Sequence, residues 1–199
     1  INDAINYLSD NSTNLQIDTT SVLLMGRSAG AHLAALLGTS NNQDAPFLET
    51  APQYKVAGVV DFFGPSNLNE LKGNSGKVDH DAPDAAEALF LGVSPRVNVP
   101  LALEASPTTY IDPEDPPFII FHGEKDRVVP ASQSKYLSMQ LSSNGVVNSL
   151  HLNESARHGD RVFDSQEYVL LVVEFVKKTL DKLVHIKYII YTYLLQIFL

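Results

Sequence analysis

One serine between two glycines is the part of this sequence best suited to covalent chemistry. Gly26, Ser28 and Gly30 form a G-x-S-x-G pattern, preceded by a short apolar run and followed by a segment rich in Ala and Leu. A serine on a sharp strand-to-helix turn exposes its hydroxyl at the end of a sheet. The amide of Ala29 is then free to hydrogen-bond an oxyanion. We expect both glycines to be required, because side chains there would collide with the neighbouring strand and helix.

A serine hydroxyl is a weak nucleophile unless a histidine accepts its proton and a carboxylate orients that histidine. The sequence offers both groups in the order Ser, Asp, His. Asp126 follows the apolar run 118–121, and His158 lies in the loop after the run 146–152. Each residue comes just after an expected strand, so parallel strands would bring them to one edge of a sheet. The sequence predicts a catalytic triad of Ser28, Asp126 and His158.

Other readings compete with this triad. A short G-x-S-x-G pattern can be only a glycine-rich turn, and an Asp in a charged turn or a His beside Gly is ordinarily a loop residue. Asp61, at the end of the run 56–63, is an alternative acid, which we interpret as a structural turn carboxylate. Glu124 lies beside Asp126, but we expect its side chain to point elsewhere. Three suitable residue types in the right order, each just past an expected strand, favour the triad.

The remaining histidines are interpreted as structural or solvated. His32, one turn into the expected helix, should be packed, His122 should brace the loop that carries Asp126, and His151 should lie within a strand. His80 stands between two aspartates and could suggest a metal ion, but such a loop is ordinarily solvated. The sequence shows no zinc spacing, phosphate-binding Gly-rich loop or dinucleotide fingerprint. We therefore expect no cofactor and no metal.

Composition narrows the class of protein further. The chain has 199 residues, 44% hydrophobic and 19% charged, which suits one globular domain. With 14 Lys+Arg against 23 Asp+Glu, its formal charge is −9, which disfavours nucleic acid or anionic lipid as the main partner. Cysteine is absent, which excludes disulfides and a thiol nucleophile but leaves the compartment open.

Strands and helices are expected to alternate along the chain. Four apolar runs predict strands, at 22–25, 56–63, 118–121 and 146–152, the last at an edge. Helices are predicted at 3–10, 28–38, 84–91, 132–141 and 164–180, with a polar break at 11–14 and an ambiguous run at 97–106. Gly38 is expected to cap the second helix. In the last helix, the residues expected to face inward are Val169, Val172, Val173 and Val176. The pattern predicts an α/β fold with a parallel sheet of about four strands flanked by helices.

With these residues in view, the chain resembles the α/β-hydrolases of the esterase and lipase type. It is most similar to the BD-FAE-like group, named for bifunctional acetylxylan and feruloyl esterases and close to the hormone-sensitive-lipase-like esterases. The matching stretches are 26–35, 59–65, 105–107 through 116–117, 121–123 through 126 to 129–130, and 158–159. The resemblance implies a serine hydrolase that cleaves acetyl, feruloyl or other short acyl esters through an acyl-enzyme. Ser28 would be the nucleophile, Asp126 the acid, His158 the base and the Ala29 amide half of the oxyanion hole.

Two features depart from the family pattern. The family carries a His-Gly-Gly type turn upstream of the nucleophile that supplies the second oxyanion donor, and this sequence contains no such motif. We therefore expect the C-terminal portion of the fold, the last four strands of an eight-stranded sheet, with the strand before Gly26 at an edge. Residues 184–199 are almost wholly apolar and have no place in the pattern. The expected division is a partial hydrolase domain over 1–183 and an apolar extension over 184–199.

Several alternatives stay open. The chain could be a catalytically impaired fragment, or a peptidase or thioesterase of the same fold. The partner implied is a small-molecule ester, with an ester carried on carbohydrate as one option, and not nucleic acid. A membrane contact of residues 184–199 rests on composition alone, since a spanning helix needs about 20 apolar residues.

Overall fold

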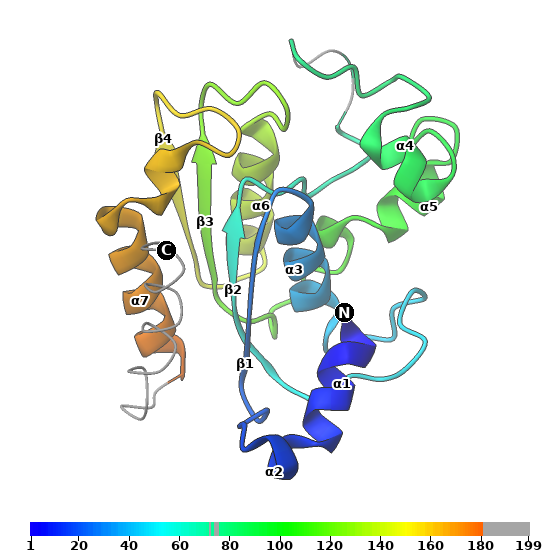
Figure 1. Ribbon diagram of the computed structural model, residues 1–199. Coiled ribbons are helices and arrows are strands. Elements are labelled where there is room, and N and C mark those ends of the chain that lie inside the picture. Colours follow the sequence, from blue (N-terminus) through cyan, green and yellow to red (C-terminus); the bar gives the residue numbers. More distant parts are fainter. Residues whose placement is uncertain (72, 74–75, 181–199) are drawn as a thin grey trace.

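A four-stranded parallel sheet forms the centre of the computed structural model, which describes residues 1–71, 73 and 76–180. The strands are β1 (Val22–Arg27), β2 (Val56–Phe62), β3 (Phe118–Gly123) and β4 (Asn148–Asn153) (Figure 1). They lie side by side in chain order, each parallel to the next. The expected α/β class and four-stranded parallel sheet are confirmed. All four carboxyl ends therefore lie along one border of the sheet, which we call its carboxyl edge, as distinct from the outer strands.

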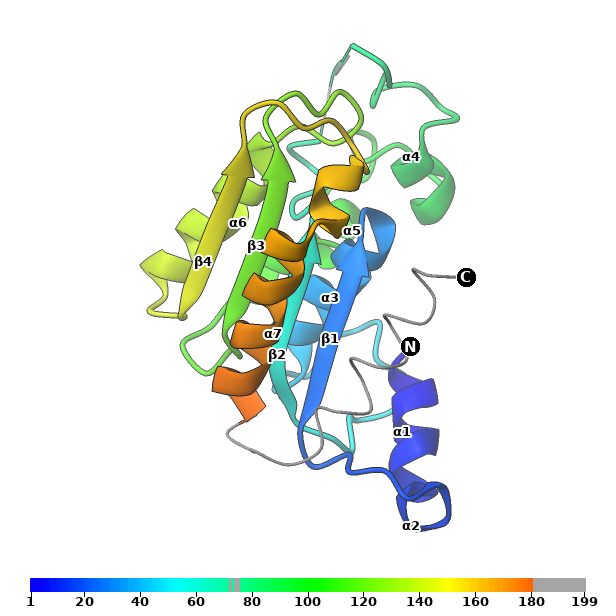
Figure 2. The ribbon, with the colours of Figure 1, turned by 60° about the vertical axis from the view of Figure 1, so that its left-hand side comes forward.

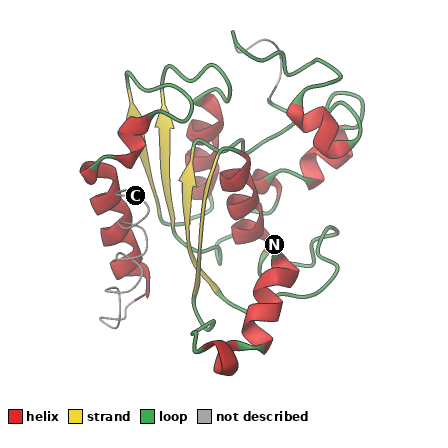
Figure 3. Ribbon diagram, viewed as in Figure 1, coloured by secondary structure: helices red, strands yellow, loops and turns green. Residues whose placement is uncertain are grey.

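Helices cover both faces of this sheet (Figure 3). Helices α3 (Ala29–Ser40) and α6 (Ser132–Ser143) lie on one face, and α7 (Gln166–Leu180) lies on the other (Figure 2). Side chains alternate between faces along a strand. Val59 of β2 accordingly packs with α3 and α6, whereas its neighbour Val60 packs in the core beneath α7. Two apolar layers thus hold the sheet in place.

Helix α7 turns a different stripe to the sheet from the expected one. Val172 packs into the core as expected, but the other sheet-facing residues are Tyr168, Leu171 and Phe175. The expectation for the remaining three valines is wrong, because the two aromatic side chains occupy the space above β2 and β3. Gly58 of β2 makes room for this contact, since a Cβ there would lie 3.0 Å from Cζ of Phe175.

Helix α3 continues beyond Gly38 and ends at Ser40, so the expectation of a glycine cap at Gly38 is wrong. The glycine lies inside the helix where α3 approaches β2. A Cβ on residue 38 would come within 2.5 Å of Cγ2 of Val59. Close packing against the sheet, and not helix termination, explains the small residue.

The remaining helices are short. They are α1 (Asn2–Asp10), α2 (Ser12–Leu15), α4 (Ala86–Leu91), α5 (Val99–Glu104) and the 3-10 turns η1 (Pro107–Thr109) and η2 (Arg161–Asp164). The break expected at 11–14 is thus mostly the single turn α2, and the ambiguous run at 97–106 is mostly α5. Helix α5 begins with Pro100 in its first turn and with Asn98 as its cap.

Strands β1 and β4 form the two edges of the sheet in the described part of the chain, as expected. None of the helices described there has the length and apolar character needed to cross a membrane. The apolar extension expected at 184–199 lies outside the described residues. The division of the chain at 183 therefore stays a prediction.

Candidate active site

Ser28 occupies a strained turn between β1 and α3. Its φ of 54° lies in the left-handed region that L-residues rarely adopt. The turn is fixed on both sides, because the Ser28 N–H donates to the Phe62 carbonyl at 2.9 Å and the Ser28 carbonyl accepts from the His32 N–H at 3.0 Å. This geometry places the hydroxyl at the carboxyl edge of the sheet.

The space around the two glycines that flank Ser28 differs, and only one of them has no room for a side chain. A Cβ on Gly26 would lie 2.1 Å from the Gly30 carbonyl oxygen, so residue 26 must be glycine for the turn to close. Apart from its chain neighbours and the backbone of its own helix, a Cβ on Gly30 would meet no heavy atom of the described residues within 4 Å. The expected collision is therefore real at position 26 and wrong at position 30. It is the Gly30 backbone that crowds Gly26.

The structure brings the three expected residues into one chain of hydrogen bonds. His158 Nε2 lies 2.9 Å from Ser28 Oγ, and His158 Nδ1 lies 2.6 Å from Asp126 Oδ2. An ionised carboxylate can only accept, so Nδ1 carries the hydrogen. The lone pair of Nε2 then faces the serine hydroxyl, which donates to it. This is the tautomer that a general base needs.

The Asp126 carboxylate is buried and held from several sides. Its Oδ1 accepts the N–H groups of Val128 at 2.8 Å and Val129 at 3.0 Å, and its Oδ2 accepts from His158. Burial alone would raise the pKa of Asp126, but the hydrogen bonds from His122, His158 and the Val128 N–H outweigh it and hold the pKa well below the ordinary value. The group therefore stays ionised beside His158 at neutral pH.

His122 braces the loop that carries Asp126, as expected. The ring is fully buried, with Nε2 donating to the Val129 carbonyl at 2.9 Å and Nδ1 lying 2.6 Å from Ser134 Oγ. Its Nε2 also lies 3.3 Å from Asp126 Oδ2. A histidine at the end of β3 therefore ties the acid loop to helix α6.

Aromatic packing around His158 was not expected from the sequence. The Phe63 ring stands edge-on to the His158 ring, with 4.9 Å between centroids. Phe63 itself has a left-handed φ of 51°. The Arg27 guanidinium lies 5.5 Å from the Phe63 centroid and pairs with Asp164 at 2.9 Å. The position of Phe63 at the end of β2, directly before Gly64-Pro65, is the sequence signal that could have drawn attention to it.

The competing acids lie elsewhere. Asp61 is fully buried in β2 and accepts the Gly64 N–H at 2.8 Å, as expected of a turn carboxylate. Burial raises its pKa to about 6 despite that hydrogen bond and the nearby His122. Glu124 accepts from Lys135 Nζ at 2.8 Å and so points away from the acid loop, as expected.

Two of the other histidines lie where they were expected, His32 packed in its helix and His151 within a strand. His32 is buried in α3 with Nδ1 2.9 Å from the Pro65 carbonyl oxygen. His151 lies in β4 with its ring stacked on Phe121 at 5.2 Å between centroids. Burial lowers the pKa of both histidines. The His32 ring is thus part of the protein interior, and the half-buried His151 ring lies on the face of β4.

His80 corrects the expectation of a solvated loop histidine. Its side chain is only 3% exposed, with Nδ1 2.7 Å from Glu87 Oε1 and Nε2 3.0 Å from the Val128 carbonyl oxygen. The side chain turns into the protein because Glu87 of α4 and the acid loop both receive it. Within the described ranges, no three His, Asp or Glu side chains are grouped closely enough to hold a metal ion.

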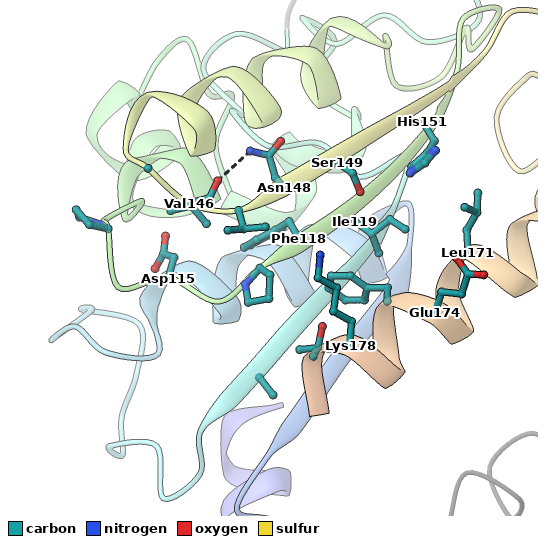
Figure 4. Close-up of a pocket in the computed structure, with 17 residues that line it drawn as sticks. Asp115, Phe118, Ile119, Val146, Asn148, Ser149, His151, Leu171, Glu174 and Lys178 are labelled. Atoms are coloured by element: carbon teal, nitrogen blue, oxygen red, sulfur yellow. Dashed lines mark hydrogen bonds between the residues drawn. The ribbon is translucent and has the colours of Figure 1, made fainter. Parts of the chain in front are cut away.

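A separate hollow of about 700 Å³ lies between α7 and the strands β3 and β4 (Figure 4). Its lining includes Phe118, Val146, Leu171 and Lys178. Phe118 is the first residue of β3, whereas the hydrogen-bonded serine lies at the carboxyl edge. The hollow is therefore not the place of the site chemistry.

A parallel sheet that carries a serine on a strained turn, followed in order by an acid and a histidine after later strands, defines an α/β-hydrolase fold. The BD-FAE family matches residues 1–141, and the chain belongs to this family. The matched part contains Ser28 and Asp126 but ends before His158. The expected resemblance is confirmed.

Among curated proteins, the chain is similar to Esterase LipQ of Mycobacterium tuberculosis (strain ATCC 25618 / H37Rv). The two are 35% identical over 150 residues, which cover 71% of this chain and 33% of LipQ. The match to the probable carboxylic ester hydrolase LipM of the same organism, at 29% identity, covers 62% of this chain and 28% of LipM. The chain thus spans about a third of the length of these relatives.

Among solved structures, the chain is similar to a truncated form of a carbohydrate esterase from gut microbiota. The TM-score is 0.72 at 28% identity, covering 88% of this chain and 66% of that one. A bifunctional GH43-CE protein of Bacteroides eggerthii gives a TM-score of 0.77 at 28% identity, covering 88% of this chain and 26% of that one. Both likenesses extend over most of the sheet and its helices.

Proposed function

We propose that this protein hydrolyses carboxylic esters of small molecules through Ser28, His158 and Asp126. The observation that carries the proposal is the continuous set of hydrogen bonds from Ser28 Oγ through His158 to Asp126. Membership of the BD-FAE family and similarity to proteins named esterases support the same reaction class.

The proposed reaction follows from the protonation states of these groups. Ser28 Oγ attacks the ester carbonyl carbon while His158 Nε2 accepts its proton, and Asp126 stabilises the imidazolium that forms. His158 then gives the proton to the departing alkoxide, which leaves as the alcohol. Water, activated by the same Nε2, hydrolyses the acyl-serine, releases the acid and restores the serine. The chain needs no metal or organic cofactor for these steps.

The Ala29 N–H is the proposed oxyanion donor. Ala29 is the first residue of α3, where a backbone N–H has no acceptor within the helix. It follows the nucleophile directly and so lies beside the carbon under attack. Loss of one such donor costs about 10²–10³-fold in rate in a well-studied hydrolase. As the family resemblance implies, we propose that the Ala29 N–H is one half of the oxyanion hole.

Short acyl esters on carbohydrate are the proposed substrate class. One solved relative is titled a carbohydrate esterase, and another, from Caldicellulosiruptor lactoaceticus, an acetyl ester-xyloside bifunctional hydrolase at 26% identity and a TM-score of 0.65. We carry this class over from the relatives. Acetylated xylan oligosaccharide, offered beside a simple aryl ester, tests the carbohydrate part separately.

Release of p-nitrophenol from p-nitrophenyl acetate tests the reaction. We expect Ser28→Ala to lower kcat by about 10³-fold or more, and Asp126→Asn to lower it by a similar factor because the wrong His158 tautomer is favoured. Equal rates for the parent chain and Ser28→Ala would contradict the proposal and support a catalytically impaired fragment. Matching p-nitroanilide and thioester substrates distinguish an esterase from a peptidase or thioesterase.

Labelling provides a second measurement that does not require turnover. A serine-directed alkyl fluorophosphonate should add to Ser28 in the parent chain, and peptide mass spectrometry locates the adduct. We expect the adduct to disappear in Ser28→Ala and to form slowly in His158→Ala, because the serine then lacks its base. Labelling of other serines at the same rate would contradict activation of Ser28.

A further inference from the structure

The peptide group between Val128 and Val129 in the acid loop is hydrogen-bonded on both sides, and the peptide groups before and after it are each bonded on one side. The N–H groups of Val128 and Val129 donate to Asp126 Oδ1 at 2.8 and 3.0 Å. The carbonyl groups of the same two residues each accept from a buried imidazole, Val129 from His122 and Val128 from His80. His80 and His122 therefore orient the backbone of the acid loop, and this backbone in turn positions the Asp126 carboxylate.

The two histidines come from different parts of the chain. His122 belongs to β3, the strand from which the acid loop begins. His80 lies 48 residues before Val128 and reaches the loop from the segment that leads into α4. Its other nitrogen contacts Glu87 of α4, and both side chains are almost fully buried, at 3% and 6% exposure. The segment around α4 is thus bonded directly to the backbone that holds the acid.

The partners of the His80 ring determine which of its nitrogens donates a hydrogen bond. A carbonyl oxygen can only accept, so Nε2 must carry a hydrogen toward Val128. One further proton is shared between Nδ1 and Glu87 Oε1, either on the ring or on the carboxyl. In both cases the pair is neutral overall, as a buried pair should be. Glu87 thereby keeps the Nε2 hydrogen directed at the acid loop.

We infer that His80, held by Glu87, is a positioning residue for Asp126. The inference rests on the proposed function, in which Asp126 orients His158. Without the Nε2 donor, the Val128 carbonyl loses its bond to His80 and the peptide is free to turn. The Val129 N–H, which belongs to the same peptide group, then moves away from Asp126 Oδ1, and the carboxylate is no longer aligned with His158 Nδ1. Misplacement by about 1 Å can lower a rate about 10²-fold.

A matched pair of variants at one position tests this role. The His80→Gln amide nitrogen reaches about as far as Nε2 and can donate to Val128, whereas the His80→Asn nitrogen ends near Nδ1 and cannot. We expect H80N to lower kcat at least about tenfold with little change in KM, and H80Q to stay within about threefold of the parent. The H80N amide can still donate to Glu87, and H80Q gives up that bond, so a fall in kcat confined to H80N cannot come from loss of the Glu87 pairing. Urea unfolding checks that both variants are folded.

A signal that needs no substrate separates this inference from the proposed function. The hydrogen in the 2.6 Å His158–Asp126 bond should give a low-field proton NMR resonance, assigned by its loss in Asp126→Ala. We expect the resonance to persist in the parent and H80Q, and to move upfield or vanish in folded H80N. If the parent hydrolyses no ester but the resonance responds in this way, the proposed function fails and the positioning role stands.

Two results would contradict the positioning role of His80. Folded H80N with the parent's resonance and kcat, or H80Q and H80N losing kcat equally, would reduce His80 to a structural residue. If H80N does not fold, Glu87→Ala and Glu87→Gln replace it. Gln can still donate to Nδ1 and leave the Nε2 hydrogen in place, so only Glu87→Ala should weaken the resonance and lower kcat. Equal behaviour of these two variants would also overturn the inference.

Discussion

At Gly26 the first turn of α3 passes so close to β1 that a single methyl group would decide whether the turn can form. The approaching atom is the Gly30 carbonyl oxygen, which lies 2.1 Å from the place that a Cβ on residue 26 would take. Because it is backbone, it cannot rotate away as a side chain would. Moving it would shift Ser28, whose left-handed backbone is already fixed by the Phe62 carbonyl. The strain at Ser28 is therefore sustained by the lack of a side chain at residue 26.

Gly26→Ala and Gly30→Ala form a matched pair that tests this account. We expect Gly26→Ala to lower the free energy of unfolding by about 3 kcal/mol or more, because a backbone clash cannot relax locally. Gly30→Ala should change it by less than about 1 kcal/mol, with a gain from helix propensity. Urea unfolding followed by circular dichroism measures both values. A similar loss in the two variants would contradict the different roles assigned to the two glycines.

Among the elements, α3 lies especially close to β2 where Gly38 faces Val59. The contact distance of 2.5 Å to a Cβ on residue 38 involves a fully buried, β-branched side chain. A β-branched side chain has restricted χ1 rotamers, and in a close-packed core it has little room to change them. The alanines of α3 that face the same core keep the helix near the strands. The close approach packs the last turn of α3 directly against β2.

Gly38→Ala sets helix propensity against packing. Alanine should gain about 1 kcal/mol in the helix, but overpacking against Val59 costs about 1–3 kcal/mol. We expect a net loss of about 1 kcal/mol in the free energy of unfolding. In a Val59→Ala background the clash is absent, so the same substitution should stabilise the protein. A double-mutant cycle by urea unfolding measures the coupling, and additive effects would contradict it.

For the molecule as a whole, stability against pH depends on a carboxyl group at the centre of the sheet. Asp61 is fully buried, and its Oδ2 has no hydrogen-bond partner among the described residues. Burial raises its pKa from 3.8 to about 6 in the folded state. A raised pKa means that the folded state binds the proton more tightly than the unfolded state. The associated stability is fully present below pH 3.8 and is lost as pH rises through about 6.

Asp61→Asn should remove this pH dependence. The amide oxygen can still accept from the Gly64 N–H, and the side chain imitates the protonated carboxyl. Between pH 4 and pH 7 we expect the parent to lose about 2 kcal/mol relative to Asp61→Asn, as the pKa shift implies. Urea unfolding at both pH values measures the difference, with the exposed Asp84→Asn as control. The same stability difference at both pH values would contradict the raised pKa.

Much of this arrangement could be predicted from the sequence because its signals are local. The apolar run before Gly26 and the small residues after it indicate strand, turn and helix, and parallel strands carry Asp126 and His158 to the edge where Ser28 lies. The sequence does not predict features that depend on one opposing atom in the folded chain, such as the room for a side chain at a glycine. Gly30 and Gly38 were assigned reasons from residue type alone, whereas the spaces around them depend on the opposing atoms.

From the amino-acid order alone one can infer the α/β class, the succession of strands and helices and the three residues that meet in the site, since each depends on chemical type and on hydrophobic pattern. The folded structure is needed to see that His80 is buried, that it bonds Glu87 and the Val128 carbonyl, and that Phe63 packs against His158. The physical reason is that burial and hydrogen-bond partners arise from groups distant in sequence. The charged loop around His80 therefore predicts a solvent-exposed side chain, whereas the fold buries it.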